Sequence, residues 1–330
     1  MILTRTPFRI SFFGGGTDLP EWYKKYNGEV LSTSIDKYCY ISARFLPSFF
    51  QNKFRIVYSR VEEKNSINDI EHPVVKALMA KMKITDGIEL HHFSDLPARS
   101  GVGSSSSFSV GVINALNSLY AQEKTKRELS MDAIDLEQNI LKESVGSQDQ
   151  IAVSYGGFNH IYFHKDGKFD IEQVKISQER LNTLKDNLLL FYTGITRLSS
   201  KIQKTQIKKI PQNIDKLKAI QSLTKIGLEI LTNEKRIIDD FGYLLGESWK
   251  IKESLTDEIS SDYIKNVYSE MLARGALGGK VLGAGGGGFM IFYANPENHE
   301  VLIRASKKFN LIHVPFNFED SGSKIIYQQE

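Results

Sequence analysis

Three clusters of glycine divide this sequence, and they restrict its fold more than any other feature. The clusters are Gly14–Gly16, Gly101 with Gly103, and Gly283 with Gly285–Gly288. The first cluster ends a short apolar run that is typical of a buried strand, the second follows a predicted strand, and the third lies between two predicted strands. The clusters recur at no fixed period, so the sequence does not favour a solenoid or a propeller. No low-complexity linker separates the two halves of the chain.

Length and composition narrow the class of protein. At 330 residues the chain is long enough for about two domains. Lys and Arg number 42 against 39 Asp and Glu, and this net charge of +3 gives no global reason to bind nucleic acid. The single cysteine, Cys39, excludes an internal disulfide and a thiolate zinc cluster. Without a signal-peptide pattern or an apolar stretch of ~20 residues, we expect a cytoplasmic protein with no membrane partner.

Apolar periodicity predicts alternating strands and helices in the first half. Strands are expected at Ile10–Phe13, Tyr38–Phe45, Arg55–Tyr58 and Ile88–Phe93, and a hairpin at Phe158–Phe163 followed by Phe169 onward. Helices are expected at Pro73–Met82 and Phe108–Leu119, from Thr125 to about Lys142, and from Ser147 to the stop at Gly156. The helices that begin at Thr125 and Ser147 each carry a capping-box pattern.

The second half is richer in long helical patterns. Helices are expected at Leu198–Ile210, Ile214–Leu231, Ile237–Leu255, Tyr263–Leu272 and about Glu297–Phe309. Strands are expected at Leu188–Tyr192, Lys280–Leu282, Phe289–Tyr293, His313–Phe318 and Lys324–Tyr327. The sequence therefore predicts an α+β fold in two domains, residues 1–184 and residues 185–330.

The segment Leu96–Ser107, between a predicted strand and a predicted helix, is the strongest candidate for a phosphate-binding loop. Its small residues allow close approach, and backbone N–H groups at a helix start bind anionic oxygens. A Walker A loop is excluded, because Arg274 stands where its first glycine belongs before Gly279-Lys280. A dinucleotide fingerprint is excluded, because Ser106 stands where its third glycine belongs. The alternative is a flexible turn with an N-cap serine.

Three acidic residues are candidates for chemistry. Asp18 follows the first glycine cluster, and Asp149 lies near a predicted helix start, where the dipole favours the ionised form that a proton acceptor needs. Glu137 offers a hard oxygen ligand for Mg²⁺. Each also has a structural reading: a helix cap for Asp18, a solvated N-terminal acid for Asp149 and an exposed helix face for Glu137. The seven histidines show no ligand spacing and are interpreted as structural.

Three motifs in this order resemble the GHMP kinases, the superfamily of galactokinase, homoserine, mevalonate and phosphomevalonate kinases. They are the segments Thr6–Asp18, Pro97–Ser107 and Lys280–Gly288. The resemblance implies a two-domain fold with the active site in the cleft between the domains. Within the superfamily, the Gly-Gly-Gly-Thr-Asp segment and Gly146–Gln150 are most similar to bacterial D-glycero-D-manno-heptose 7-phosphate kinases. Galactokinases usually carry Glu and His where this chain has Gly15 and Gly16, so the chain leaves room for a larger substrate.

The resemblance also implies roles for single residues. Arg9 matches the basic residue that stabilises the reacting hydroxyl and phosphoryl groups, and Asp149 matches the catalytic acid. Asp18 matches the acid that contacts the sugar, and Thr17 and Gly16 are expected to bind substrate beside it.

Three further groups of residues follow from the same resemblance. The nucleotide-binding residues are expected to be Pro97, Arg99, Gly101, Gly103, Ser104, Ser105 and Ser106. The Mg²⁺ ligands are expected to be Ser105 and Glu137, since Glu137 stands twelve residues before Asp149 as the Mg²⁺-binding Glu does in galactokinases. The third motif, expected to lie beneath the loop and to shape the acceptor pocket, contributes Gly283, Gly285, Gly286 and Gly287.

The resemblance implies ATP- and Mg²⁺-dependent transfer of a phosphoryl group to the anomeric hydroxyl of a sugar or sugar phosphate, with the heptose phosphate as the leading acceptor. Another sugar 1-kinase, similar to fucokinase or galactokinase, is the alternative within enzymes. A ligand-binding regulator without turnover is the alternative of a different class. Retention of Arg9, Ser105, Glu137 and Asp149 argues against a regulator.

A basic stripe raises a separate question about the acceptor. Arg197, Lys201, Lys204 and Lys208 are spaced so that a helix would place them on one face. The simpler interpretation is a solvated face. The sharper one is that Arg197 binds the phosphate of a sugar phosphate, because its planar fork can donate two hydrogen bonds to phosphate.

Overall fold

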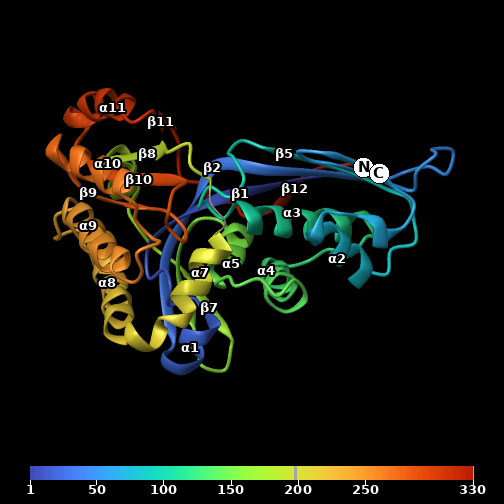
Figure 1. Ribbon diagram of the computed structural model, residues 1–330, viewed down its shortest axis with the longest axis horizontal. Helices are drawn as coiled ribbons and strands as arrows, with labels where there is room; N and C mark the ends of the chain where they lie inside the picture. Colours follow the sequence, from blue (N-terminus) through green and yellow to red (C-terminus); the bar gives the residue numbers. More distant parts are fainter. Residues whose placement is uncertain (197–198, 330) are drawn as a thin grey trace.

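Two sheets organise the protein, whose computed structural model describes residues 1–196 and 199–329 (Figure 1). The larger sheet has the strand order β12-β1-β2-β5-β3-β4, with β6 paired to β2 and β7 paired to β6. Its strands are β1 (Ile2–Phe13), β2 (Gly28–Phe45), β3 (Phe54–Val57), β4 (Val61–Lys64), β5 (Ile88–Ser94), β6 (Phe158–Phe163), β7 (Phe169–Gln173) and β12 (Lys324–Gln328). All neighbours are antiparallel except β3 and β5.

The length of β2 allows one strand to serve two partners. Its first residues, Gly28–Thr33, pair with β6, and its last residues, Cys39–Phe45, pair with β5. Strand β1 lies beside β2 and is also longer than the predicted Ile10–Phe13. The apolar run marks only the end of β1, because the first half of the strand buries hydroxyl groups. Thr4, for example, is fully buried and donates a hydrogen bond to the carbonyl of Gly111.

Helices cover one face of this sheet, and Figure 1 shows α2, α3 and α4 on the same side of it, with α3 next to the strands. Helix α3 packs against both β1 and β2, and nearly all of its residues after the first turn are buried. The helices of this half are α1 (Pro20–Tyr26), η1 (Ile67–Asp69), α2 (Pro73–Lys81), α3 (Ser104–Leu119), α4 (Lys126–Ile134), η2 (Asp135–Ile140), α5 (Gln148–Tyr155) and α6 (Gln178–Asp186).

The smaller sheet has the order β11-β8-β10-β9 and is antiparallel throughout. Its strands are β8 (Leu188–Tyr192), β9 (Ala276–Val281), β10 (Phe289–Ala294) and β11 (Ile312–His313). The accompanying helices are α7 (Ser199–Lys208), η3 (Ile210–Gln212), α8 (Ile214–Thr232), α9 (Asp240–Glu253), α10 (Asp262–Ala273), η4 (Pro296–Asn298) and α11 (His299–Lys307). After β11 the chain returns to the larger sheet, where β12 pairs with β1.

Most predicted elements are present, and the mixed α and β architecture is confirmed. The capping box at Thr125 is confirmed, because its hydroxyl and the Glu128 carboxylate exchange hydrogen bonds with backbone N–H groups. The second capping box is wrong: the hydroxyl of Ser147 caps no N–H and instead accepts a hydrogen bond from Gln138. Elements α6 and β4 were not predicted. Among the described residues, no helix combines the length and apolarity needed to span a membrane.

Candidate active site

Arg9 and Asp149 form the charged centre of the candidate site. The Nε and Nη2 of Arg9, on β1, donate to the two carboxylate oxygens of Asp149, on α5, over 2.7 and 2.8 Å. The remaining Nη1 donates to the carbonyl of Gly101 over 2.6 Å. The Arg9 side chain is 3% exposed, whereas that of Asp149 is 27% exposed. Arg9 therefore holds a fixed carboxylate whose outer surface stays open to a substrate.

The loop before α3 is locked against the third glycine cluster. A Cβ on Gly101 would lie 2.5 Å from the carbonyl oxygen of Leu282, and a Cβ on Gly283 would lie 2.7 Å from the Cα of Gly101. The backbone carbonyl of Ser100, in the loop, accepts a hydrogen bond from the N–H of Phe289 over 3.0 Å. Both glycines also have positive φ, of 85° and 71°. Glycine is needed at both positions because backbone meets backbone there.

The rest of the third motif packs on the second half of the chain. Gly285 and Gly286 lie against Ile259, whose carbonyl accepts the N–H of Gly286 over 2.8 Å. Gly287 lies against Ile195. These glycines form a turn between β9 and β10, and the contacts described for them are with Ile259 and Ile195.

The start of α3 has the geometry of an anion site. Gly103 is its N-cap with φ 77°, and a Cβ there would lie 3.0 Å from the Cγ of Arg9. The first N–H groups of a helix, here those of Ser104–Ser106, have no partner within the helix. The hydroxyl of Ser104 accepts the N–H of Arg99, which has a positive φ of 59°. Pro97 and Arg99 are exposed on the same loop.

Glu137 meets Ser106 in a buried polar cluster. It lies in the π-helical turn η2, which interrupts the helix predicted to reach Lys142, and only 1% of its surface is exposed. Its Oε2 accepts from Ser106 over 3.1 Å and from Gln150 over 2.5 Å, while Oε1 has no hydrogen-bond partner among the described residues. Burial raises the pKa of Glu137 to about 7, while the neighbouring Ser109, Gln150 and Ser106 side chains act in the opposite direction. Ser105, the serine expected beside Glu137, is exposed instead.

Asp18 lies close to the Arg9–Asp149 pair but is buried. One of its oxygens accepts the N–H of Gly16 over 2.9 Å, and the other lies 3.4 Å from the N–H of Gln148. Burial raises the pKa of Asp18, and the charge of Asp149 acts in the same direction. The hydroxyl of Thr17 donates to the carbonyls of Gly14 and Glu29, so its contacts stay within the protein backbone.

Lys252 is a charged residue of the site that sequence reasoning missed. It lies on α9, is 7% exposed, and donates to the carbonyl of Gly283 over 2.5 Å. Burial lowers its pKa to about 8, with the charges of Asp18 and Asp149 opposing that shift. A signal for it exists in the sequence. Lys252 continues the apolar stripe of Phe241, Leu245 and Trp249 at helical spacing, and a lysine on that face is out of place unless it meets a charge.

Arg197 lies outside the described residues. The other three residues of the stripe, Lys201, Lys204 and Lys208, lie on α7 and are exposed. The opposite face of α7 contacts the third motif, where Gln206 donates to the carbonyl of Ala284 over 3.0 Å. For these three lysines the structure agrees with a solvated face.

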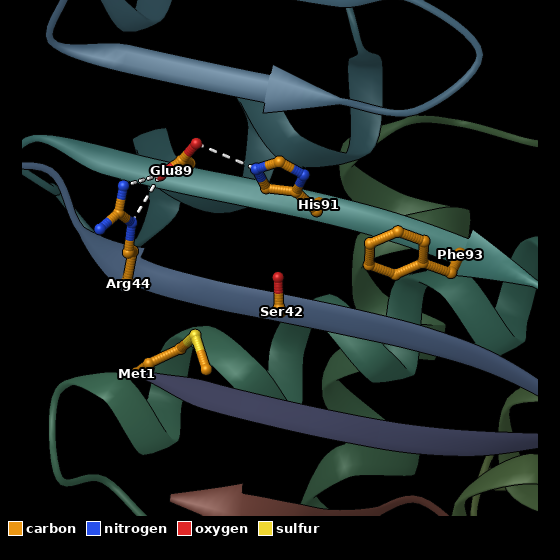
Figure 2. A pocket seen from close by; sticks show the side chains of 6 residues that line it. All are labelled: Met1, Ser42, Arg44, Glu89, His91 and Phe93. Carbon is orange, nitrogen blue, oxygen red and sulfur yellow. Dashed lines mark hydrogen bonds and ion pairs between the residues drawn. The ribbon is translucent and has the colours of Figure 1, made fainter. Parts of the chain in front are cut away.

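A surface cavity lies on the open face of the larger sheet, away from the residues above (Figure 2). It has a volume of about 140 Å³ and is lined by Met1, Ser42, Arg44, Glu89, His91 and Phe93. Burial would raise the pKa of Glu89, but hydrogen bonds from His91, Arg44 and Arg55 lower it to about 2. The cavity contains no predicted site residue, and its carboxylate is fully engaged. Within residues 1–196 and 199–329, no group of three His, Cys, Asp or Glu side chains is placed to hold a metal ion.

Comparison with known families matches both halves of the chain. Residues 68–157 match the family described as GHMP kinases N terminal domain, and residues 234–310 match GHMP kinases C terminal. The first match includes the loop, Glu137 and Asp149, and the second includes Lys252 and the third glycine cluster.

Individual proteins extend this similarity over the whole chain. The D-glycero-alpha-D-manno-heptose 7-phosphate kinase of Campylobacter jejuni is 30% identical over 336 residues, covering 98% of both chains. The bifunctional fucokinase/GDP-fucose pyrophosphorylase of Arabidopsis thaliana is 23% identical over 87% of this chain and 29% of its own length. Among solved structures, a D-glycero-D-manno-heptose 1-phosphate kinase from Bacteroides thetaiotaomicron has a TM-score of 0.82 over 100% of both chains, at 22% identity.

Proposed function

Because the chain belongs to the GHMP kinase family and is a sugar kinase, we propose that it phosphorylates the anomeric hydroxyl of D-glycero-D-manno-heptose 7-phosphate, using ATP. The product is the 1,7-bisphosphate. The observation that carries this proposal is the 30% identity to a heptose 7-phosphate kinase along 98% of both chains. The absence of side chains at Gly15 and Gly16 supports an acceptor larger than a hexose.

In this proposal Asp149 receives or orients the proton of the acceptor hydroxyl. Its carboxylate is held by two hydrogen bonds from Arg9, so it is fixed before substrate binds. Arg9 also bonds the loop carbonyl of Gly101, which links the acid to the segment that carries the nucleotide. The cationic guanidinium offsets the charge that develops during phosphoryl transfer.

The nucleotide loop is proposed to run from Pro97 to Ser106, with the phosphates at the start of α3. The free N–H groups of the first helical turn and the dipole of α3 favour an anion there. Two oxygen ligands fit Mg²⁺ here. They are the carboxylate of Glu137, one of whose oxygens has no partner among the described residues, and the hydroxyl of Ser106. A bound Mg²⁺ supplies positive charge to the phosphates.

The test is a kinase assay on a panel of acceptors. The purified protein receives ATP and Mg²⁺ together with heptose 7-phosphate, free heptose, mannose 6-phosphate, galactose or L-fucose. ADP release gives the rate, and phosphorus NMR locates the new phosphate. We expect the highest kcat/KM with heptose 7-phosphate and a new anomeric phosphate. A higher value with galactose or fucose would instead assign the chain to the sugar 1-kinase alternative, and no turnover would favour a regulator.

A further inference from the structure

Gly15 is a glycine that neither the backbone nor the packing of this chain explains. Its neighbours Gly14 and Gly16 have positive φ values of 85° and 104°, whereas Gly15 does not. A Cβ on Gly15 would have only ordinary contacts: 3.7 Å to the Nζ of Lys252, 3.8 Å to the Nε2 of Gln148 and 3.9 Å to the Oγ of Ser11. An alanine therefore fits. The position that a Cβ would take is faced by three polar groups.

The three side chains have unused hydrogen-bonding capacity, although in Gln148 it lies on Oε1 and not on the Nε2 that is nearest to Gly15. Among the described residues, the Oγ of Ser11 and the Oε1 of Gln148 have no partner. The ammonium of Lys252 makes one hydrogen bond, to Gly283, although it carries three donors. All three residues are at least nine-tenths buried. Buried polar groups without partners are costly, which indicates that something else binds them.

The surrounding charges select the chemistry of that ligand. Asp18, Arg9 and Asp149 all lie near enough to affect the pKa of Lys252, which the two carboxylates raise and the guanidinium lowers. The carboxylates accept hydrogen bonds from hydroxyls, and the ammonium donates to hydroxyl oxygens. Neighbouring hydroxyl groups, which both donate and accept, satisfy this arrangement.

We propose that Ser11, Gln148 and Lys252 form a subsite around Gly15 that holds hydroxyl groups of the sugar acceptor. Lys252 reaches it from α9 in the second half of the chain, whereas Ser11 and Gln148 come from the first half. The subsite thus draws its polar groups from both halves of the chain. The inference rests on the proposed function, in that the acceptor is a sugar, and it does not depend on which sugar.

The first test is Gly15→Ala, with the acceptor that the wild-type enzyme uses best. The added methyl group occupies the subsite without a clash, so the thermal unfolding midpoint is expected to stay unchanged. We expect the KM for the acceptor to rise at least about tenfold, the effect of losing about one hydrogen bond to a charged group, with the KM for ATP unchanged. An unchanged acceptor KM overturns the subsite.

The second test uses paired variants. Lys252→Met is compared with Lys250→Met, which removes the same charge from an exposed position on α9. Ser11→Ala is compared with Ser118→Ala, because both serines are buried and neither hydroxyl has a partner among the described residues. We expect only Lys252→Met and Ser11→Ala to raise the acceptor KM, while the KM for ATP stays constant. Equal values within each pair overturn the inference.

These outcomes are separable from those of the proposed function. A wild-type enzyme that prefers another sugar over heptose 7-phosphate contradicts the proposed acceptor, and the variants are then measured with that sugar. A wild-type enzyme that uses heptose 7-phosphate while all variants keep its acceptor KM contradicts the subsite alone. A wild-type enzyme that phosphorylates none of the sugars contradicts both the proposed function and the subsite.

Discussion

At the scale of single residues, Asp149 is the acid on which the proposed chemistry depends. Asp149→Asn places an amide against the Nε or Nη2 of Arg9 and removes the proton acceptor. We expect kcat to fall about 10²–10⁴-fold. Since the only side-chain hydrogen bonds of Asp149 among the described residues are with Arg9, and none is with the start of α3, ATP affinity measured by calorimetry should remain. Turnover within a factor of two of the wild type would remove Asp149 from the mechanism.

We expect the two serines at the start of α3 to differ in their effect on the Mg²⁺ concentration that activity requires. Ser106 hydrogen-bonds to Glu137, whereas Ser105 is exposed. We expect Ser106→Ala to raise the Mg²⁺ concentration for half-maximal activity several-fold, since it removes a hard oxygen beside the carboxylate. Ser105→Ala is the matched control, measured in the same titration. A larger effect for Ser105→Ala would indicate that Ser105 is the Mg²⁺ ligand, as expected from the sequence.

Glu137 makes the stability of the unliganded protein depend on pH. Its pKa is raised to about 7, so in the folded state it keeps a proton that an unfolded chain loses near its ordinary value. Its contribution to stability is therefore greatest at low pH and is lost as pH rises toward 7. Glu137→Gln stays neutral, so we expect its thermal midpoint to exceed that of the wild type increasingly between pH 5 and pH 8. Parallel curves without Mg²⁺ would contradict the buried, protonated carboxyl.

At the scale of elements, the sequence predicts what depends on local pattern. The apolar stripes of α3 and α8 and the capping box at Thr125 were sufficient to place those helices. Contacts made far along the chain were not predictable. The hydroxyl of Ser147 bonds Gln138 instead of capping α5, and the π-helical turn at Glu137 brings its carboxylate to Ser106. The family motifs supplied Arg9 and Asp149, but Lys252 belongs to no motif: the sequence marks it only as a lysine on an apolar helix face, and its partners emerge from packing.

Gly103 shows how the loop element and the catalytic pair depend on each other. Gly103→Ala introduces a side chain at positive φ and places its Cβ 3.0 Å from the Cγ of Arg9. We expect kcat to fall at least about tenfold and ATP affinity to weaken, because the arginine and the loop must both shift. Gly167→Ala is the control, since Gly167 has a φ of 87° but no atom within 4 Å of the added Cβ. Equal kinetic constants in the two variants would mean that any effect of Gly103→Ala comes from backbone strain and not from the contact with Arg9.

At the scale of the whole molecule, the two sheets are joined at the strand that carries the site. Lys280, on β9 of the smaller sheet, donates to the carbonyls of Ser11 and Phe12 at the end of β1 over 3.0 and 2.7 Å. Burial lowers the pKa of Lys280 well below its ordinary value. Gly283, three residues after Lys280, meets Gly101 of the loop. Arg9 is therefore positioned by both halves of the protein, although it belongs to the first. A cleft between domains divided at residues 184 and 185 stays a prediction.

The last strand provides the sharpest test of this dependence on the whole molecule. Strand β12 covers the edge of β1, the strand that positions Arg9, although about 315 residues separate them in sequence. Truncation after Ser323 removes β12 but keeps the hydrogen bond between the hydroxyls of Ser323 and Thr6 and the one that Ser323 accepts from the amide of Asn114. We expect the free energy of unfolding to fall by about 1–3 kcal/mol, since several ladder hydrogen bonds and the packing of the half-buried Ile325 are lost.

Urea denaturation measures that loss, with truncation after Gln328 as the control that retains β12. Because β1 is also held by β2 over most of its length, the folded fraction should keep the wild-type KM values for ATP and acceptor. The truncated enzyme should therefore lose activity only as it unfolds, at a lower urea concentration than the control. A truncated enzyme with unchanged stability would show that β2 and α3 suffice to hold β1. A selective rise in acceptor KM would instead show that β12 sets the position of Arg9 in the folded state.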